Sequence, residues 1–549
     1  MDICGFQKWL KQQQSTQLLL RREGHKGETG MYDSETLFNM GKYRVRFSGK
    51  HEAIYDYDTG KHYTYFEMDK RSDKLAWFLT EKLGLKKGDR IGFCATNSVA
   101  FFDAFFTTYK TGLIITTYNC LLREKELFSL IENEAPKVIF YSGEFTFTVM
   151  SLREKGFTQE FICLDEPCEG DTYCYSDIMN NEDYKEPVNP GLDYEDIQML
   201  IHTGGTTGTP KAAMISFRSI FYNSMADSTG FQLSENDTAI LTLPLFHTAG
   251  WNVFTLPLLS IGGRIIIMRG FNPTKVLSAI REERPTVGIS VETMYKALAM
   301  QPDFAETDFS CYRILVTGAA PTGRELLELF WAKGVKMVNA YGMTEVGPNN
   351  MCHPVGLIEI EDVRAKWNSC GIPAPFNQVR FVDDEGKDVP KGERGELVFG
   401  GKLLFSGYWN NPEATAVIMH DGWVHTGDMG YLDEDGFCYI SGRKKNMFIS
   451  GGENIFPQEI EDVIMLVPGV LEACIVGVPD PKWGEVGRVL IVRAPGVNVT
   501  REEIIKTVKT ELSSIKVPKY VTFVDSVPKN AVGKRDLNEI RKLFGKPED

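Results

Sequence analysis

The sequence predicts an α/β protein that ends in a separate, smaller α+β domain. In the first 190 residues, short apolar runs alternate with segments of helical periodicity, which is typical of a mainly parallel sheet with helices on both faces. A strand-rich stretch with several Gly and Pro turns runs from Gly371 to Tyr408, and a last group of elements begins near Gly442. At 549 residues the chain is too long for one compact core, so about three or four structural units are expected.

The first alternating run can be assigned in order from its apolar spacing. The expected elements are helix Leu75–Leu83, strand Arg90–Ala95, helix Phe101–Lys110, strand Leu113–Thr117, helix Glu124–Asn133 and strand Val138–Tyr141. Residues 164–195 are acidic and polar, and they are expected to form a linker or a surface excursion.

The alternation restarts at a strand, Ile197–Ile201, that leads into a Gly/Thr-rich loop. Later elements are expected as strands Thr238–Leu243, Arg264–Ile267, Val287–Ser290, Arg313–Val316 and Val335–Asn339, and as helix Gly323–Lys333. Residues 238–263 contain no Asp, Glu, Lys or Arg, which is long enough for a membrane span. Because Pro244, Gly250 and Pro257 interrupt this stretch, a buried strand, a turn and a buried helix explain it better.

The C-terminal elements form a different pattern. From Pro457 the expected order is helix, strand, strand, helix, strand, loop, helix. The helices are expected at Pro457–Met465 and Arg501–Leu512, and the strands at Glu472–Val478, Arg488–Arg493 and Tyr520–Val524. The charged run Arg443–Asn446 precedes them and reads either as a hinge or as an exposed basic turn. We therefore expect an N-terminal domain over 1–442, a hinge over 443–446 and a C-terminal domain over 447–549.

Composition and charge exclude several classes of protein. The chain is 43% hydrophobic and 24% charged, with a net charge of −14, which argues against nucleic acid or an anionic membrane as the main partner. Eleven cysteines form no C-x-x-C pair, and the N-terminus has no apolar stretch of signal-peptide length. These features favour the cytoplasm and free thiols. Cys163, Cys168 and Cys174 form a loose cluster, for which unpaired loop cysteines are favoured over a zinc site.

The most informative motif is the run from Thr203 to Lys211. It places four hydroxyls, three glycines and one lysine within nine residues. Glycines allow the backbone to approach a ligand closely, while the hydroxyls, free N–H groups and the lysine can face phosphate oxygens. The spacing is not that of a Walker A loop, so a nucleotide triphosphate is expected on a different scaffold.

Four further segments carry groups suited to a nucleotide. They are Tyr341-Gly342-Met343-Thr344-Glu345 after a strand, Thr426-Gly427-Asp428, Gly442-Arg443, and Pro528–Lys534 with a lysine just past a glycine. Ligands of α/β sheets usually bind at strand-end loops, and a carboxylate can accept ribose hydroxyls. Each segment alone is weak, since most such tripeptides are ordinary turns.

The five segments in this order resemble the core motifs of the acyl-adenylate-forming ligase superfamily. The superfamily includes acyl-CoA synthetases, luciferases and the adenylation domains of peptide synthetases, and the resemblance is strongest from Ile197 to Lys534. It implies a large N-terminal domain of layered α/β subdomains with a β-rich subdomain, and a small mobile α+β C-terminal domain. It also implies two half-reactions. A carboxylate first attacks ATP to give acyl-AMP and pyrophosphate with Mg²⁺, and a thiol then attacks acyl-AMP.

The resemblance also implies residue roles. The loop residues that would hold the β- and γ-phosphates are Thr203, Gly204, Gly205, Thr206, Thr207, Gly208, Thr209 and Lys211. The adenine would be flanked by Gly318, Ala319, Ala320, Pro321 and Tyr341, with Tyr341 stacking, and the cofactor site would also include Asn339, Ala340 and Gly342. Thr344 would contact phosphate, and Glu345 and Thr203 would hold Mg²⁺. Asp428 would bind the ribose beside Arg443, and Lys445 would lie at the hinge. In the second half-reaction, the residues that face the site would be Gly451, Gly452 and Glu453. Lys534 would reach the α-phosphate and the carboxylate. The expected catalytic residues are Lys534, Thr344, Lys211 and His247.

The same motifs limit the acid and the acceptor. No acidic residue lies between Thr238 and Gly263 to balance a substrate ammonium, so an amino acid substrate is not expected. An apolar acid fits better, with a medium- or long-chain fatty acid ahead of an aryl acid. His247 either approaches the substrate carboxylate or is a buried core histidine, and Trp251 and Phe254 either line the acyl channel or belong to the core.

Coenzyme A is the expected acceptor, because Ile449–Ile455 looks most like acyl-CoA synthetases. The alternatives are transfer to a carrier protein's phosphopantetheine, or a catalytically inactive binding protein, which should have lost Lys534, Glu345 or part of the loop. The chain departs from the usual pattern at Thr116–Cys120, where a Pro-containing turn is common, and at His202. We expect a monomer or homodimer with no nucleic acid partner and no integral membrane segment.

Overall fold

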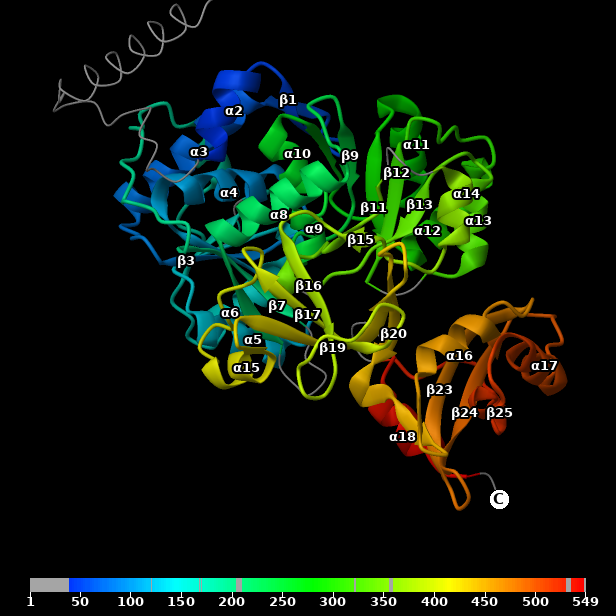
Figure 1. Cartoon of the computed structure of the whole chain (residues 1–549). Helices are drawn as coiled ribbons and strands as arrows, with labels where there is room; N and C mark the ends of the chain where they lie inside the picture. Colours follow the sequence, from blue (N-terminus) through cyan, green and yellow to red (C-terminus); the bar gives the residue numbers. More distant parts are fainter. Residues whose placement is uncertain are drawn as a thin grey trace, which may run out of the picture. The chain divides into compact units, whose positions relative to one another are not determined.

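The computed structural model describes residues 39–119, 121–166, 168, 170–203, 210–319, 322–354, 359–529 and 535–547. Within these residues the chain forms sheets of seven, six, five, five and two strands (Figure 1). The two largest sheets are mainly parallel and carry helices, and the C-terminal part has a sheet of its own. The predicted α/β class, with a large N-terminal part and a small C-terminal one, is confirmed.

The six-stranded sheet has the order β6-β5-β3-β4-β7-β8. Its first five strands are parallel, and β8 returns antiparallel to β7. All four residues of both β4 and β5 are buried, as expected for parallel strands covered on both faces. The strands are β3 (Arg90–Cys94), β4 (Ile114–Thr117), β5 (Val138–Tyr141), β6 (Glu160–Cys163), β7 (Ile197–Thr203) and β8 (Lys211–Ser216); the helices of this region are α3 (Tyr65–Trp77), α4 (Val99–Thr111), α5 (Glu124–Glu134), α6 (Thr146–Glu154), α7 (Tyr175–Asn180) and α8 (Phe217–Gly230).

The seven-stranded sheet has the order β13-β12-β11-β9-β10-β1-β2, and only β2 is antiparallel to its neighbour. Figure 1 shows α11, α12 and α13 beside β11, β12 and β13. The strands are β1 (Glu52–Asp56), β2 (Lys61–Thr64), β9 (Thr238–Leu241), β10 (Arg264–Ile267), β11 (Val287–Val291), β12 (Ile314–Gly318) and β13 (Met337–Asn339); the helices are α2 (Met40–Ser48), α9 (Thr248–Asn252), α10 (Thr255–Ile261), α11 (Pro273–Glu283), α12 (Glu292–Ala299) and α13 (Arg324–Trp331).

An antiparallel sheet follows, in agreement with the predicted strand-rich stretch. Its long strand β19 lies between β17 and β20, so that Asp428 on β19 pairs with Arg443 on β20. The elements of this region are β14 (Met351–Cys352), α14 (Ile360–Ala365), β15 (Ile372–Pro373), β16 (Asn377–Val382), β17 (Gly395–Gly401), α15 (Pro412–Ile418), β18 (Met419–His420), β19 (Trp423–Leu432) and β20 (Cys438–Arg443).

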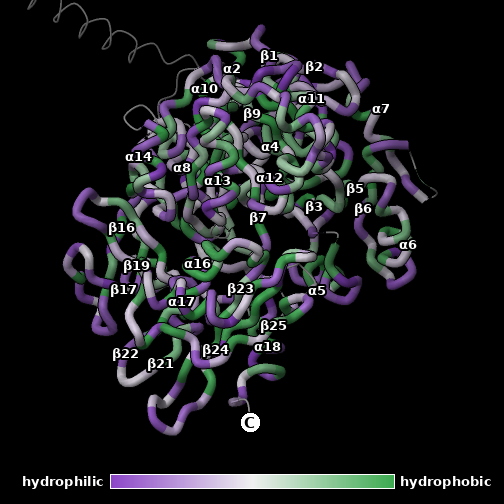
Figure 2. Tube along the Cα trace, turned by 90° about the vertical axis from the view of Figure 1, so that its right-hand side faces the viewer, coloured by the Kyte–Doolittle hydropathy of each residue, from purple (hydrophilic) through white to green (hydrophobic). Residues whose placement is uncertain are grey.

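The C-terminal part follows the predicted order of elements. Its strands β23 and β24 form a long antiparallel hairpin, to which β25 adds in parallel. Residues of α16 and α17 pack on one face of this sheet and Ile540 of α18 on the other, and Figure 2 shows hydrophobic segments along β23 and β24. The elements are β21 (Phe448–Ser450), β22 (Glu453–Ile455), α16 (Pro457–Ile464), β23 (Val470–Asp480), β24 (Gly484–Arg493), α17 (Arg501–Glu511), β25 (Tyr520–Phe523) and α18 (Leu537–Phe544).

The stretch without charged residues, 238–263, is an interior segment. It forms β9, α9 and α10, and six of the seven residues of α10 are buried. Trp251 is fully buried, donates from Nε1 to the Leu245 carbonyl at 2.6 Å, and packs against Phe101, Phe102 and Phe105. None of the described helices is both long and apolar enough to cross a membrane.

Two sequence-based expectations need correction. The helix expected at Leu75–Leu83 begins much earlier, as α3, and continues after Trp77 as a π-helix over Phe78–Lys82. A capping box fixes its start, since Thr64 accepts from the Glu67 backbone while the Glu67 carboxylate accepts from that of Thr64. The expected linker over 164–195 contains α7, which Tyr175 anchors by donating to Asp103 at 2.7 Å. Cys163, Cys168 and Cys174 are free thiols.

Truncation of Trp251 to Ala should destabilise the N-terminal part by about 3–5 kcal/mol, because it removes a fully buried indole and leaves a cavity among three phenylalanines. Urea unfolding followed by circular dichroism measures this change. Phe147→Ala is the matched control, since Phe147 is 85% exposed and its loss should cost less than about 0.5 kcal/mol. Equal costs for the two variants would contradict the core assignment of Trp251.

Candidate functional site

The candidate site lies where three parallel strands end. Thr203 is the last residue of β7, Gly318 the last of β12 and Asn339 the last of β13. Ligands of α/β sheets bind outside the carboxyl ends of the strands, so these positions mark the expected face of both sheets. The Ala340 backbone N–H donates to the Thr317 carbonyl at 2.8 Å, which directs the chain from β13 into the motif that follows.

The loop from Ala340 to Gly347 has a tightly fixed backbone. The Tyr341 carbonyl accepts from the Asn350 N–H at 2.9 Å, and Met343 pairs with Gly347. A Cβ atom at Gly342 would lie 2.2 Å from the Pro348 carbonyl oxygen, so that only glycine fits there. Thr344–Val346 then forms one 3₁₀ turn, which buries Thr344 and Glu345.

Four side chains meet at this loop; after the ligand that the sequence motifs imply, we call Thr203, Lys211, Glu345 and Tyr408 the phosphate-side group. The Tyr408 hydroxyl donates to Glu345 Oε1 at 2.6 Å, and both residues are buried. The Lys211 ammonium lies 5.2 Å from the centre of the Tyr408 ring. Burial raises the pKa of Tyr408, the Glu345 carboxylate raises it further, and a hydrogen bond with the Thr203 hydroxyl opposes both.

A second set of side chains also meets at this loop; after the ligand that the sequence motifs imply, we call Tyr341, Asp428 and Arg443 the ribose-side group. The Tyr341 hydroxyl donates to Asp428 Oδ2 at 2.6 Å, and Arg443 Nε lies 2.7 Å from Asp428 Oδ1. Arg443 Nη1 also donates to the Thr426 carbonyl at 3.0 Å, which fixes the guanidinium against β19. The Tyr341 ring stacks on Phe399, with ring centres 6.1 Å apart.

Burial governs the electrostatics of the ribose-side group. Burial raises the pKa of Asp428, while the nearby Arg443 charge and the Tyr341 hydrogen bond oppose the increase. Burial also lowers the pKa of Lys445, and the positive charges of Arg443 and Arg541 lower it further. Asp428 therefore lies beside two cationic side chains, Arg443 and Lys445. Their positive charges favour the ionised carboxylate, whereas burial favours the neutral acid.

The structure brings together many, but not all, of the residues singled out from the sequence. Thr203, Lys211, Tyr341, Glu345, Asp428 and Arg443 belong to the two groups joined by the 340–347 loop. Ala319 follows β12 with a left-handed backbone, φ 69°, which is uncommon for a non-glycine residue. The described residues Gly451, Gly452 and Glu453 make no hydrogen bond or ion pair with either group. Gly204–Thr209, Ala320, Pro321 and Lys534 lie outside the described residues.

The acyl-site residues divide between surface and core. His247 is exposed immediately before α9, so the alternative of a buried core histidine is wrong. Trp251 and Phe254 are buried at 0% and 1% exposure, and Phe254 packs against Phe231. These two aromatic residues belong to the core.

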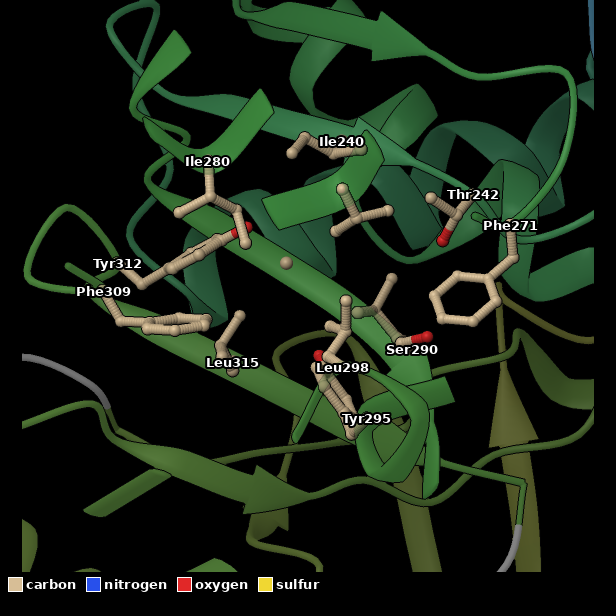
Figure 3. Close-up of a pocket in the computed structure, with 13 residues that line it drawn as sticks. Ile240, Thr242, Phe271, Ile280, Ser290, Tyr295, Leu298, Phe309, Tyr312 and Leu315 are labelled. Atoms are coloured by element: carbon tan, nitrogen blue, oxygen red, sulfur yellow. The ribbon is translucent and has the colours of Figure 1, made fainter. Parts of the chain in front are cut away.

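An apolar cavity of about 30 Å³ lies between β9, β11 and β12 and the helices α11 and α12 (Figure 3). Thr242 and Ser290 line it near the carboxyl ends of their strands, and Phe271, Tyr312 and Leu298 lie around it. His247 is not one of its lining residues. The cavity is large enough for a water or two and too small for a long alkyl chain.

Sequence reasoning missed Tyr408 and the partners of His202. Tyr408 is 63 positions from Glu345, and no local pattern marks it as a partner. His202 Nε2 lies 2.6 Å from Glu134 Oε1, and the Thr116 hydroxyl donates to Glu134 Oε2 at 2.5 Å. Thr116 and His202, two departures from the usual pattern, therefore contact one buried carboxylate.

The ends of the segment that carries Lys534 are tied to the C-terminal sheet. Lys529 and Arg535 pair as an antiparallel bridge. Arg535 Nη1 lies 2.7 Å from Glu461 of α16, while Arg535 Nε and the Lys529 ammonium lie 3.2 and 3.1 Å from Glu472 of β23. The base of this segment is therefore held by ionic contacts to two elements.

Comparison with known proteins places this geometry in a family. The AMP-binding enzyme family matches residues 42–409, and the AMP-binding enzyme C-terminal domain matches residues 459–534. A feruloyl-CoA synthase from Amycolatopsis sp is 36% identical over 88% of this chain and 94% of its own length. The long-chain-fatty-acid–CoA ligase FadD13 from Mycobacterium tuberculosis is 33% identical over 92% of this chain and 98% of its own length.

A solved structure agrees with the sequence matches. ATP-bound MatB from Rhodopseudomonas palustris superposes with a TM-score of 0.81 and 28% identity, over 92% of this chain and 99% of its own. The first family match includes all four residues of the phosphate-side group, while Asp428 and Arg443 lie between the two matches. The chain belongs to the AMP-binding enzyme family.

Proposed function

We propose that this chain activates a carboxylic acid with ATP and transfers the acyl group to coenzyme A, as an AMP-forming acid–CoA ligase. The first half-reaction gives acyl-AMP and pyrophosphate, and the second gives the thioester and AMP. The observation that supports this most is that the 340–347 loop supplies a residue to each group, Glu345 to the phosphate-side group and Tyr341 to the ribose-side group. One group offers a lysine and a carboxylate, and the other offers a carboxylate held by a guanidinium.

The proposed role of the phosphate-side group is charge balance. The attacking carboxylate and the triphosphate are both anionic and repel each other, so cations must neutralise the charge that develops on the phosphate oxygens. Lys211 supplies one cation, and by its motif Lys534 supplies another. Tyr408 holds Glu345 by one oxygen and so fixes its orientation.

The residues present fit a Mg²⁺ ion that takes most of its ligands from ATP. Mg²⁺ commonly uses one or two carboxylates together with substrate phosphates. No cluster of three or more His, Cys, Asp or Glu side chains suited to a metal occurs among the described residues, whereas Glu345 and the Thr203 hydroxyl offer hard oxygen donors. These two residues would hold the ion, which when bound would neutralise triphosphate charge.

The proposed role of the ribose-side group is to hold the nucleoside. Each carboxylate oxygen of Asp428 has two lone-pair positions, and Tyr341 and Arg443 occupy one position on each. Acceptor positions therefore remain for ribose hydroxyls. Since Phe399 packs against the Tyr341 ring, the orientation of that ring is fixed before a nucleotide binds.

We propose an acid with an uncharged, apolar body. The segment from Thr238 to Gly263 offers no acidic side chain to balance a substrate ammonium. A medium- or long-chain fatty acid is one candidate, in line with the printed name of the Mycobacterium relative. A compact aryl acid is the second, in line with the printed name of the feruloyl-CoA synthase relative.

A substrate panel should separate these candidates. Purified protein with ATP, Mg²⁺ and coenzyme A is expected to release AMP with fatty or aryl acids and not with amino acids, because no acidic side chain would balance a substrate ammonium. AMP release is measured for each acid with and without coenzyme A. Pyrophosphate exchange that depends on the acid, without turnover of coenzyme A, would instead indicate a carrier-protein acceptor.

Lys534→Ala should slow adenylation by roughly a hundredfold or more, because one cation is lost from the developing phosphate charge. Thioester formation from supplied acyl-AMP should change little. The two half-reactions are measured separately, by pyrophosphate release and by thioester formation. Lys542→Ala is the control, since this lysine has a 73% exposed side chain and pairs only with Glu539 among the described residues. Equal losses in both half-reactions would contradict the proposed role of Lys534.

The KM for ATP should rise as the pH falls below neutral, over an acidic range that lies above the ordinary aspartate pKa of about 3.9. Burial raises the pKa of Asp428, so this carboxylate takes up a proton at a higher pH than an ordinary aspartate and then accepts ribose hydroxyls less well. Steady-state kinetics across this range measure the effect. Asp428→Asn should give a high KM for ATP that varies less with pH. The same slope in both proteins would assign the titration to another group.

A further inference from the structure

A buried carboxylate that belongs to neither side-chain group lies beside the β7–β8 hairpin, next to the last residues of β7. Glu134, the last residue of α5, is fully buried and contacts His202 of β7 and Thr116 of β4 at 2.6 and 2.5 Å. The other ring nitrogen of His202, Nδ1, lies 2.9 Å from the Thr117 carbonyl. Since both ring nitrogens face acceptor oxygens, the imidazolium form satisfies both contacts and Glu134 balances its charge.

His202 is joined directly to the phosphate-side group by the backbone. It precedes Thr203, and in the β7–β8 hairpin His202 pairs with Ala212 while Thr203 pairs with Lys211. Tyr118 stacks on the imidazole with ring centres 5.5 Å apart, which limits its movement. A shift of His202 would therefore shift both Thr203 and Lys211.

The same end of α5 also holds the segment beside Tyr408. The carbonyl of Asn133, which precedes Glu134, accepts from Trp409 Nε1 at 3.3 Å and from Asn410 Nδ2 at 3.1 Å. The Trp409 backbone N–H donates to the Ala212 carbonyl at 2.8 Å, and Tyr408 pairs with Ala213. The carboxyl end of α5 thus contacts two of the three segments that supply the phosphate-side group, the β7–β8 hairpin and the segment beside Tyr408.

We propose that Glu134 and His202 are positioning residues for ATP, which set the placement of Thr203, Lys211 and Tyr408 without touching the nucleotide. A buried ion pair contributes little net stability compared with apolar packing, so the gain expected from this one is a fixed geometry. The proposal rests on the ATP-binding part of the proposed function. It predicts an effect on ATP that exceeds any effect on the acid or on coenzyme A.

Glu134→Gln is the decisive variant. The amide oxygen can still accept from His202, and the amide NH2 can donate to the Thr116 hydroxyl, so the change mainly removes the negative charge that balances the imidazolium. The Kd for ATP, from equilibrium dialysis, and the KM for ATP should each rise at least about tenfold, which corresponds to about 1.4 kcal/mol. The KM for coenzyme A should stay within about twofold of wild type.

A second buried ion pair provides a matched control. Lys110 on α4 lies 2.5 Å from Asp73 and 2.7 Å from Asp69, both on α3, and all three residues are buried. Asp73→Asn should lower the Tm, as removal of one partner from a buried pair does, while the Kd for ATP stays within about twofold. A loss of ATP affinity equal to that of Glu134→Gln would overturn the proposal, since any buried pair would then have the same effect.

The remaining outcomes each decide one point. Folded Glu134→Gln with a wild-type Kd for ATP would overturn the positioning role, as would equal losses for ATP and coenzyme A. If Glu134→Gln does not fold, His202→Gln tests the same contact, and a wild-type Kd for ATP in that variant would overturn the proposal. Where both single variants fold, the double variant should lose less ATP affinity than the product of the two single losses. A wild-type protein that binds no ATP would instead overturn the proposed function. If the protein binds ATP but converts none of the acids, the Kd values for ATP of Glu134→Gln and Asp73→Asn still test the positioning role.

Discussion

Two buried carboxylates must coexist in this site with the most highly charged ligand proposed for it. Glu345 and Asp428 are each buried, and each is held by a tyrosine hydroxyl at 2.6 Å, from Tyr408 and Tyr341. A buried carboxylate without such donors would favour its protonated form, because desolvation disfavours the charge. Each tyrosine hydroxyl fixes the direction of one carboxylate oxygen through a neutral hydrogen bond. It therefore adds no positive charge that would itself attract a phosphate. These two hydrogen bonds tie the 340–347 loop to Tyr408 and to β19, in addition to the backbone contacts that fix it.

Much of the fold could be predicted from local patterns. Strand Val138–Tyr141 and strand Arg264–Ile267 have the expected bounds, because short apolar runs between helices leave little freedom of assignment. The start of α3 was missed although its signal was present, as Thr64 and Glu67 form a capping box in the sequence T-x-x-E. The short helix α7 could not be found, because its polar surroundings resemble a linker and a tertiary contact to Asp103 anchors it.

The residues of the candidate site also fall into those that the sequence could predict and those that it could not. Residues in recognisable motifs, such as Lys211, Glu345 and Asp428, could be selected from the sequence because their types and order suit phosphate and ribose. Tyr408 and Glu134 could not, since their partners lie 63 and 68 positions away and nothing in their local sequence indicates the pairing. In the sequence, His202 stood out only because it departs from the usual pattern. The structure shows that this histidine pairs with the buried carboxylate of Glu134.

The expected effect of a buried ion pair in this chain depends on where the pair lies, because the Lys110 and His202 pairs are similarly buried. The Lys110 pair joins two packed helices, α3 and α4, and fixes their contact. The His202 pair is similar in length and burial, but it lies one residue before Thr203, on a strand whose partner begins at Lys211. An interaction that contributes little stability can still restrict a geometry, and its consequence depends on what the restricted strand carries. Here that strand ends in the Thr203 hydroxyl and pairs with the strand that begins at Lys211.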